Sequence, residues 1–332
     1  MKKKDYNEEL KKIIIEYFNN SKKKPIFFCD IDKKINLSIF EKKVYSYKNQ
    51  LEKIWIKFKL KRNLAILTER NIDYLALIFA AWLAKGYYLP LSKLSPQKNI
   101  DYQIRCSNIS VVAKNFCKKN KFFSVKKKKI KKKYINNDDT AYTIFTSGST
   151  GKKKGVIISK KAFIKYLDSL KKTFKNNKKL NSLIINGEMT FDISLADIAF
   201  AIIFQSGVAI TDNSKNIISL LYMLKFHQIH SLYVVPSTLE RIVHYLEENK
   251  NFKLPNLLQI NSGGELLNMN LIKRAKKMLR KTVFYNFYGP TEFTINATYH
   301  KINFKKKYES DSVPIGKVFP GINYKITKKK EK

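Results

Sequence analysis

The apolar residues of this chain follow two alternating periods. Short continuous apolar runs, typical of buried strands, are separated by longer segments in which apolar residues recur every three to four positions, as on one face of a helix. This alternation is typical of βαβ units around a mostly parallel sheet, so we predict an α/β fold. The expected strands are 64–68, 87–91, 111–113, 141–146, 155–159, 183–185, 208–210, 232–235 and 257–260, and the expected helices are 74–85, 162–170, 195–204, 217–227, 238–249 and 269–279.

Changes in composition predict how the chain divides into subdomains. A charged N-terminal stretch is expected to be a helical lead-in, and a lysine-rich stretch between two α/β units is expected to be a loop. After Val283 the pattern becomes richer in strands. We therefore predict two stacked α/β subdomains with mostly parallel sheets, followed by a partial β-rich third subdomain. The predicted segments are 1–36 (lead-in), 37–125 (first subdomain), 126–137 (loop), 138–282 (second subdomain) and 283–332 (β-rich part).

The net charge of +40 does not by itself indicate a nucleic-acid-binding protein. The chain is 44% hydrophobic, which excludes a disordered polycation. Only six of its 66 basic residues are arginine, the residue that grips phosphates and guanines bidentately, and the lysines are spread along the whole sequence. The densest run, 125–133, is either a polyanion-binding arm or a solvated loop, and we favour the loop. We do not expect nucleic acid as a partner.

The cysteines and the apolar segments indicate the compartment. Cys29, Cys106 and Cys117 lie far apart, which argues against a disulfide framework or a zinc knuckle and fits a reducing environment. The N-terminus leads into no apolar signal core, and the most apolar segment, 74–84, is too short to cross a bilayer. We expect a cytoplasmic protein with no membrane partner.

One segment has the composition of a phosphate-binding loop. The predicted strand 141–146 runs into a cluster of hydroxyl residues and glycines, followed by three lysines and another strand. Glycines allow consecutive N–H groups to converge on an anion, hydroxyls donate to it, and lysine supplies positive charge. The Walker spacing is absent, and an ordinary polar hairpin is the weaker alternative. The candidate residues are Thr146, Ser147, Gly148, Ser149, Thr150, Gly151 and Lys154.

This segment resembles the nucleotide-binding signature of the adenylate-forming enzymes, the family of acyl-CoA ligases, luciferases and amino-acid adenylation domains. Three further segments resemble family motifs in the same order, namely Phe191-Asp192-Ile193-Ser194, Ser262-Gly263-Gly264-Glu265, and the run from Asn286 to Glu292. Weaker similarities lie at 85–91 and 313–317. The resemblance implies the fold of the N-terminal core of these enzymes, with ATP and Mg²⁺ as cofactors.

The resemblance also assigns roles that the residues suit on physical grounds. The Tyr288 ring can stack on adenine, and the Thr291 hydroxyl can meet the α-phosphate. Glu292 and Thr146 can hold Mg²⁺, and Lys154 is the third catalytic candidate. Without the resemblance, this run would be interpreted as a tight turn after a strand. The implied nucleotide-binding residues beyond the phosphate loop are Gly263, Gly264, Glu265, Asn286, Phe287, Tyr288, Gly289, Thr291 and Glu292.

Asp192 indicates the class of substrate. Its sequence position also suits a residue that begins a helix, which is the simpler interpretation. In the amino-acid-activating branch of the family, the matching aspartate pairs with the substrate ammonium group, and a buried carboxylate needs such a partner. We therefore expect an amino-acid substrate. The pocket positions implied by the motifs are Asp192, Ile193, Ala196, Ser262, Phe287 and Ile295. Because most of them are apolar or small, we expect a neutral, hydrophobic side chain on the substrate.

Two amino-acid-activating subfamilies fit this pattern. The Asp-Ile pair at 197–198 resembles the D-alanine carrier-protein ligases, whereas Gly263-Gly264-Glu265 resembles the adenylation domains of nonribosomal peptide synthetases more closely. We favour the second. The implied activity is formation of aminoacyl-AMP and pyrophosphate from ATP, followed by transfer to the phosphopantetheine thiol of a carrier protein.

The chain departs from the family after the segment at 313–317. The later Tyr-x-Thr-Gly-Asp segment and the C-terminal domain, with its bridging lysine, have no match in the sequence. We therefore expect impaired activity unless a separately encoded C-terminal domain acts as a partner. The alternative is a truncated remnant that binds ATP or an amino acid without catalysis.

Overall fold

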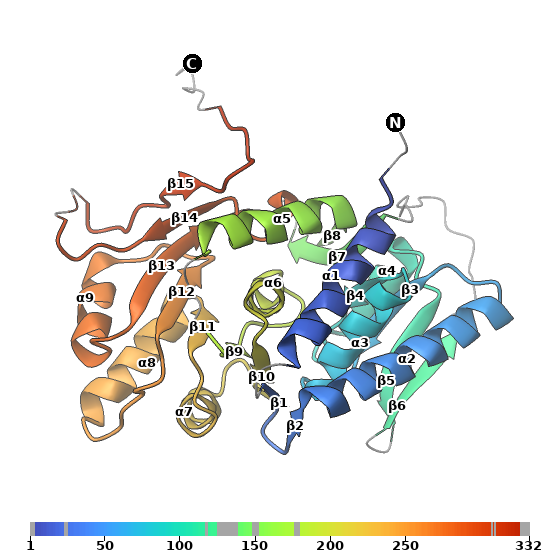
Figure 1. Cartoon of the computed structure of the whole chain (residues 1–332), viewed down its shortest axis with the longest axis horizontal. Coiled ribbons are helices and arrows are strands. Elements are labelled where there is room, and N and C mark those ends of the chain that lie inside the picture. The colour runs from blue at the N-terminus through green and yellow to red at the C-terminus, as the bar shows by residue number, and fades with distance from the viewer. Residues whose placement is uncertain are drawn as a thin grey trace.

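Two sheets lie side by side in the computed structural model, with helices between them and on their outer faces (Figure 1). The structure describes residues 4–22, 26–116, 119–124, 139–147, 153–175, 180–306, 308 and 310–325, without the side chains of 115–116, 119–120 and 147. No helix in these ranges is long and apolar enough to cross a membrane. The α/β architecture with mostly parallel sheets is confirmed.

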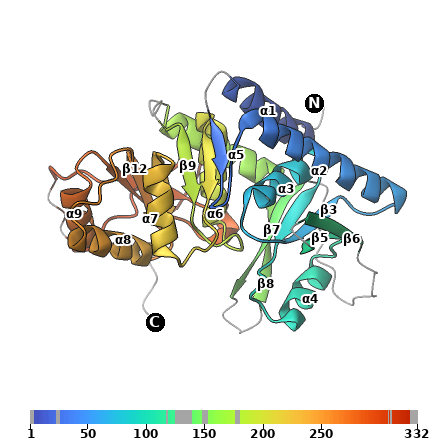
Figure 2. The same cartoon turned by 90° about the horizontal axis from the view of Figure 1, so that it is seen from below.

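The smaller sheet has six strands in the order β6-β5-β3-β4-β7-β8. Alternate residues along β3 face opposite sides, so Leu64 and Ile66 pack toward α2 and α3, and Ala65 packs toward α4. Figure 2 shows α3 and α4 on opposite faces of this sheet. The elements are α2 (Leu37–Lys57), β3 (Asn63–Leu67), α3 (Ile72–Leu83), β4 (Tyr87–Pro90), α4 (Gln97–Cys106), β5 (Val111–Phe116), β6 (Lys119–Ser124), β7 (Thr140–Ser147) and β8 (Lys153–Ser159).

The larger sheet has nine strands in the order β15-β14-β13-β12-β11-β9-β10-β1-β2. From β1 to β13 its neighbouring strands are parallel, and β2, β14 and β15 pair antiparallel at the two edges. The strands are β1 (Phe27–Cys29), β2 (Lys34–Asn36), β9 (Ser182–Ile185), β10 (Gly207–Ile210), β11 (Ser231–Val234), β12 (Gln259–Gly263), β13 (Val283–Tyr288), β14 (Thr298–Lys301) and β15 (Lys317–Val318).

The largest hydrophobic cluster joins the two sheets. It contains side chains from α1, α5 and α6 between the sheets, together with α3 and the sheet faces on either side. A second cluster lies under α7, α8 and α9 on the other face of the nine-stranded sheet. The two sheets therefore share one continuous core. The remaining elements are α1 (Tyr6–Ser21), α5 (Lys160–Thr173), α6 (Ile193–Phe204), α7 (Ile217–Phe226), α8 (Pro236–Glu248), α9 (Met269–Met278) and the 3₁₀ helix η1 (Thr291–Phe293).

The strands of each sheet come from more than one of the segments expected from composition. Strands β1 and β2 belong to the expected lead-in 1–36 but complete the nine-stranded sheet, and β7 and β8 belong to the expected segment 138–282 but lie in the six-stranded sheet. Long-range pairing decides this, because Tyr142 pairs with Tyr88 of β4 and the Trp82 indole donates to the Ala141 carbonyl at 2.9 Å.

Several local expectations also need adjustment. The strand expected at 257–260 forms later, at 259–263, and α2, α4 and β6 were not expected at all. The lysine-rich loop 126–137 lies outside the described residues.

Candidate functional site

A pocket of about 500 Å³ lies where the nine-stranded sheet changes direction. The chain passes from β9 to β10 on one side of β9 and then returns to β11 on the other side, so the helices α6 and α7 diverge at this point. Such a switch point leaves a crevice at the carboxyl ends of the strands, which is the usual ligand site of open α/β sheets. Four predicted site residues line the pocket, namely Asp192, Ile193, Gly264 and Glu265.

Asp192 lies at the start of α6 but does not act as a helix cap. Its side chain makes no capping hydrogen bond, and its Oδ2 atom is buried without a partner among the described residues. Burial raises the pKa of the Asp192 carboxyl to about 6, and the Thr291 hydroxyl offsets only part of this effect. Asp192 therefore begins α6, as the simpler interpretation expects, but its side chain does not cap the helix, and a cationic group in the pocket would find the Oδ2 atom available.

The Gly-Gly-Glu segment forms the opposite wall at the end of β12. Gly264 has a φ of +87°, a backbone conformation that a residue with a side chain rarely adopts. A Cβ atom on Gly263 would lie 2.5 Å from the Phe287 carbonyl oxygen, so only glycine allows β12 and β13 to approach here. Glu265 accepts hydrogen bonds from both the amide and the hydroxyl of Ser237, each at 2.9 Å. The Glu265 carboxylate therefore stabilises the N-terminus of α8 at the rim of the pocket.

Of the predicted site residues at the end of β13, Tyr288 is exposed, whereas Asn286 and Phe287 are buried. Tyr288 is 51% exposed, which leaves its ring available to stack on a planar ligand. Phe287 is buried among other aromatic rings, including Tyr233 and Phe319. The Asn286 amide donates to the carbonyls of Val313 and Pro314, at 3.1 and 3.0 Å. Asn286 therefore holds the 313–317 segment against β13 and does not line this pocket.

The turn after Tyr288 lies against the hairpin that carries the stems of the predicted phosphate loop. Gly289 is packed closely, since a Cβ there would lie 2.6 Å from the Asn296 Cα atom. Thr291 and Glu292 form η1, which contacts β8 of the six-stranded sheet. Glu292 is exposed and lines a neighbouring pocket of about 340 Å³.

The β7–β8 hairpin places two of the catalytic candidates opposite each other. Thr146 is paired with Lys154 across the antiparallel strands, and Lys154 is exposed. Gly148, Ser149, Thr150, Gly151 and the Ser147 side chain lie outside the described residues. The structure thus brings the stems of the expected phosphate loop to the same edge as η1, but it leaves the predicted loop itself untested.

The other predicted pocket positions are packed into the core. Ala196, Ser262, Phe287 and Ile295 are each at most 3% exposed. None of these four lines the pocket, although the Ser262 hydroxyl is buried without a partner among the described residues. The structure therefore does not place these four predicted positions in the wall of this pocket.

Two features of the site gave no local signal in the sequence. Asn296 accepts a hydrogen bond from the Tyr233 hydroxyl at 3.0 Å and donates to the Tyr166 hydroxyl at 2.9 Å, which links α5, β11 and the loop after η1. Just before it, Thr294 and Ile295 have φ values of +66° and +73°. Such angles are strained for β-branched residues and cluster at functional sites.

Arg70 is the second feature that sequence patterns did not reveal. It follows β3 in the six-stranded sheet, yet its guanidinium donates to carbonyl oxygens in the loops after β9 and β10, to Gly187 at 2.7 Å and Thr211 at 2.9 Å. Further bonds run to the carbonyls of Ile185 and Asn186. Arg70 therefore positions the β9–α6 loop that carries Asp192.

Comparisons with known proteins find relatives in sequence and in fold. Zwittermicin A synthase ZmaJ of Bacillus cereus is 28% identical over 88% of this chain, and the chain spans 60% of that relative's length. The adenylation domain AlmE of Vibrio cholerae, solved with glycyl-adenosine-5′-phosphate, superimposes with a TM-score of 0.76 at 19% identity, covering 94% of this chain and 64% of AlmE. The peptide synthetase FmoA3 with AMPPNP superimposes with a TM-score of 0.78 at 16% identity, covering 93% of this chain and 34% of FmoA3.

A match to a protein-family profile assigns the chain to a family, which similarity of fold alone does not do. The profile described as AMP-binding enzyme matches residues 56–332, which include the β7–β8 hairpin, Asp192, the Gly-Gly-Glu segment and the turn at η1. Because this match covers most of the chain and contains every element of the site, the chain belongs to the AMP-binding enzyme family.

Proposed function

We propose that this chain adenylates an amino acid with ATP, releasing pyrophosphate, and that the aminoacyl group is then transferred to the phosphopantetheine thiol of a carrier protein. The observation that carries the proposal is the Asp192 carboxylate, which lies in the switch-point pocket with one oxygen buried and unpartnered among the described residues. A substrate ammonium group would supply the missing partner. A plain carboxylic acid would leave Asp192 unpaired, so an amino acid is the better match.

The core positions that the family motifs assign to the substrate pocket support a small, neutral side chain. Tyr233 and Phe287, with ring centroids 5.5 Å apart, belong to the same buried cluster as Ala196, and Ser262 is also buried. Glycine and alanine would need the least rearrangement there. The glycyl-adenylate bound to AlmE is in keeping with this size, and D-alanine, the substrate of the alternative subfamily, remains within the same limit.

In the proposed reaction, a carboxylate oxygen of the amino acid attacks the α-phosphorus of ATP and the bond to the bridging oxygen breaks, so that pyrophosphate leaves. Asp192 would hold the ammonium group and fix the carboxylate in line with the phosphorus. The hydroxyls of Thr146 and Thr291 would donate to the α-phosphate, and Lys154 would stabilise its developing negative charge. Tyr288 would stack on the adenine ring.

The residues also suit Mg²⁺, which adenylation requires to neutralise phosphate charge. Glu292 is an exposed carboxylate with no hydrogen bond among the described residues, next to the hairpin that carries Thr146. Mg²⁺ typically takes one or two protein oxygens together with substrate phosphates, so a dedicated cluster of protein ligands is unnecessary. No group of three or more His, Cys, Asp or Glu residues in the described part of the chain could hold a metal ion.

Amino-acid-dependent ATP–pyrophosphate exchange tests the proposal. The assay would use this chain with glycine, D-alanine and the L-amino acids, alone and with a separately expressed C-terminal domain of a relative. We expect exchange with one small amino acid, and a loss of at least about 100-fold in kcat/KM for Asp192→Asn, because one partner of a partly buried charge pair is removed. Asp311→Asn, which neutralises an exposed aspartate outside the pocket, is the matched control.

Two outcomes would count against the proposal. Exchange that survives Asp192→Asn unchanged would remove the amine-binding role. A folded chain that binds ATP but gives no exchange with any amino acid, with or without the added domain, would indicate a binding remnant instead of an enzyme.

A further inference from the structure

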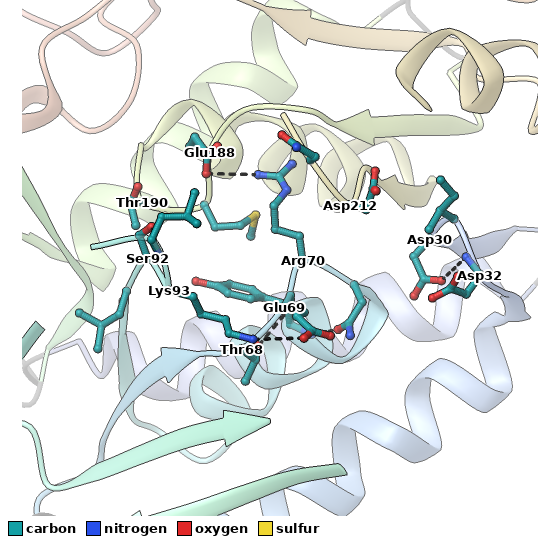
Figure 3. A pocket seen from close by; sticks show the side chains of 17 residues that line it. Asp30, Asp32, Thr68, Glu69, Arg70, Ser92, Lys93, Glu188, Thr190 and Asp212 are labelled. Atoms are coloured by element: carbon teal, nitrogen blue, oxygen red, sulfur yellow. Dashed lines mark hydrogen bonds and ion pairs between the residues drawn. The ribbon is translucent and has the colours of Figure 1, made fainter. Parts of the chain in front are cut away.

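A second pocket, of about 400 Å³, lies at the switch point of the six-stranded sheet. Helix α3 leads from β3 to β4 on one face, and α4 leads from β4 back across β3 to β5 on the other, so a crevice opens at the carboxyl ends of β3 and β4. The turns after β1, β9 and β10 close it from the nine-stranded sheet (Figure 3). The assigned function leaves this crevice unused.

The charge of this pocket is opposite to that of the chain. Five carboxylates and two cationic side chains line it, although the whole chain carries a net charge of +40. Both cationic side chains already have partners in the protein. Arg70 donates to the carbonyls of Gly187 and Thr211, and the Lys93 Nζ atom lies 3.1 Å from the Glu69 Oε1 atom. Figure 3 shows Arg70 reaching toward Glu188, away from Asp30 and Asp32. The remaining charge is negative.

The geometry of Asp30 shows that the acidic wall is built into the fold. Its Oδ1 atom accepts from the amides of Asp32 and Lys33, at 3.1 and 3.0 Å, and its Oδ2 atom accepts from the Ile72 amide at 3.1 Å. These bonds fix the β1–β2 turn against the N-terminus of α3. The Asp32 carboxylate, which makes no hydrogen bond among the described residues, is thereby held at the rim.

A buried hydroxyl provides an independent indication of a ligand. Tyr74 lines the pocket, its side chain is 1% exposed, and its hydroxyl has no hydrogen-bond partner within the described ranges. A buried hydroxyl without a partner is unfavourable, so a ligand with a polar group would compensate for it. The apolar residues Leu91, Leu94 and Met189 also line the pocket and suit a ligand with a carbon chain.

We propose that this pocket binds a small organic cation, an alkyl amine or diamine, between the acidic turn at Asp32 and the Tyr74 hydroxyl. A volume of about 400 Å³ suits a small molecule better than a bare ion. The carboxylates are too dispersed for a metal, since no cluster of three metal-ligating side chains occurs in the described part of the chain. The positive charge of the whole chain repels cations in general, so binding of an amine requires this local site.

Calorimetric titration with pentane-1,5-diamine tests this site, with pentane-1,5-diol and glutarate as the neutral and anionic counterparts. The titrations contain no ATP and no amino acid, so they are independent of the proposed adenylation. We expect saturable binding of the diamine with a Kd below about 1 mM and none of the diol or glutarate. Tyr74→Phe should weaken binding about fivefold to tenfold, and Asp32→Asn about twofold to fivefold.

The control variants separate this pocket from other acidic sites. Asp311→Asn, at an exposed aspartate outside the pocket, and Asp192→Ala, in the switch-point pocket of the other sheet, should leave the Kd unchanged. The proposal is overturned if the folded chain does not bind the diamine, if the diol binds as tightly, or if Asp192→Ala rather than Tyr74→Phe weakens binding.

Discussion

At the scale of single residues, the burial of Asp192, the proposed partner of the substrate ammonium group, lowers the stability of the folded chain. Burial raises the pKa of its carboxyl from 3.8 to about 6. The unfolded chain therefore ionises this group at lower pH than the folded chain, and the folded state loses stability as the pH rises from about 4 to about 6. A bound ammonium group would remove this penalty, which couples substrate binding to the ionisation of Asp192.

This coupling predicts a pH-dependent stabilisation by Asp192→Asn. Without substrate, the variant should have a higher free energy of unfolding than the wild type by about 1–3 kcal/mol above pH 6. Below pH 4 the two proteins should differ little, since Asp192 is then protonated in both states. Urea denaturation between pH 3.5 and 7.5 measures the difference, and a difference that does not vary with pH would contradict the raised pKa.

Backbone strain beside the site gives a second prediction for a single residue. Thr294 has a φ of +66°, a conformation that costs a residue with a Cβ about 1–2 kcal/mol. Thr294→Gly should therefore be more stable than Thr294→Ala by about 1 kcal/mol. At Thr298, in strand β14, the order of the same two variants should be reversed, because glycine is unfavourable there. Thermal or urea unfolding of the four variants decides the matter, and alanine as the better residue at both positions would rule out the strain.

At the scale of secondary-structure elements, Arg70 couples the end of β3 to the loops after β9 and β10. Its planar guanidinium satisfies several carbonyls at once, which a lysine ammonium cannot do in the same geometry. Arg70→Lys should lower the free energy of unfolding by about 2–4 kcal/mol, because buried carbonyls lose their donors.

The same substitution should also affect the site through the β9–α6 loop, as an increase in KM for the amino acid larger than any decrease in kcat. Arg62→Lys is the matched control, since Arg62 is exposed and its guanidinium makes a single hydrogen bond within the described ranges, to the Ala84 carbonyl at 3.1 Å. Equal effects of the two variants on stability and on KM would remove the special role of Arg70.

At the scale of the whole molecule, the shared core predicts that the two sheets unfold together. Trp55 and Trp82, the two tryptophans of the chain, lie in α2 and α3 beside the six-stranded sheet. Phe200 lies in α6 beside the nine-stranded sheet, is 0% exposed and belongs to the same cluster as Trp82.

Phe200→Ala should therefore lower the urea midpoint of unfolding. The midpoint measured by tryptophan fluorescence should fall by as much as the midpoint measured by circular dichroism. The expected loss is about 3–5 kcal/mol, typical of a phenylalanine removed from a core. Coincident urea transitions of wild type and variant by both probes would fit one cooperative unit. A fluorescence transition that Phe200→Ala leaves in place would show that the sheets unfold separately.

The parts of the candidate site that consist of residues adjacent in sequence could be predicted from the sequence. Thr146, the Gly-Gly-Glu segment and the turn with Thr291 and Glu292 lie at carboxyl ends of strands, and the family that these motifs resemble is the one to which the chain belongs. The positive φ at Gly264 is a local backbone requirement that glycine meets, whereas the close approach at Gly263 is to Phe287 in the neighbouring strand and arises only in the folded sheet.

Other features depended on contacts between distant parts of the chain. The β7–β8 hairpin joins the six-stranded sheet because Tyr142 packs beside Tyr88, and no local pattern distinguishes this from pairing with its neighbours in sequence. The use of Asn286 to hold the 313–317 segment, and of Glu265 to bind Ser237, is likewise invisible in the motifs, which record residue types and spacing but not direction.

The sequence by itself determined the α/β class, the order of the motifs and the family, since hydrophobic periodicity and motif spacing are local properties. Only the tertiary structure decided which strands share a sheet, that the Oδ2 atom of Asp192 is buried without a partner among the described residues, and that a second, acidic pocket forms where the ends of β3 and β4 meet the turns after β1, β9 and β10. The physical reason is that burial and charge in these places come from residues far apart in the chain, and their effects exist only once the two sheets are packed together.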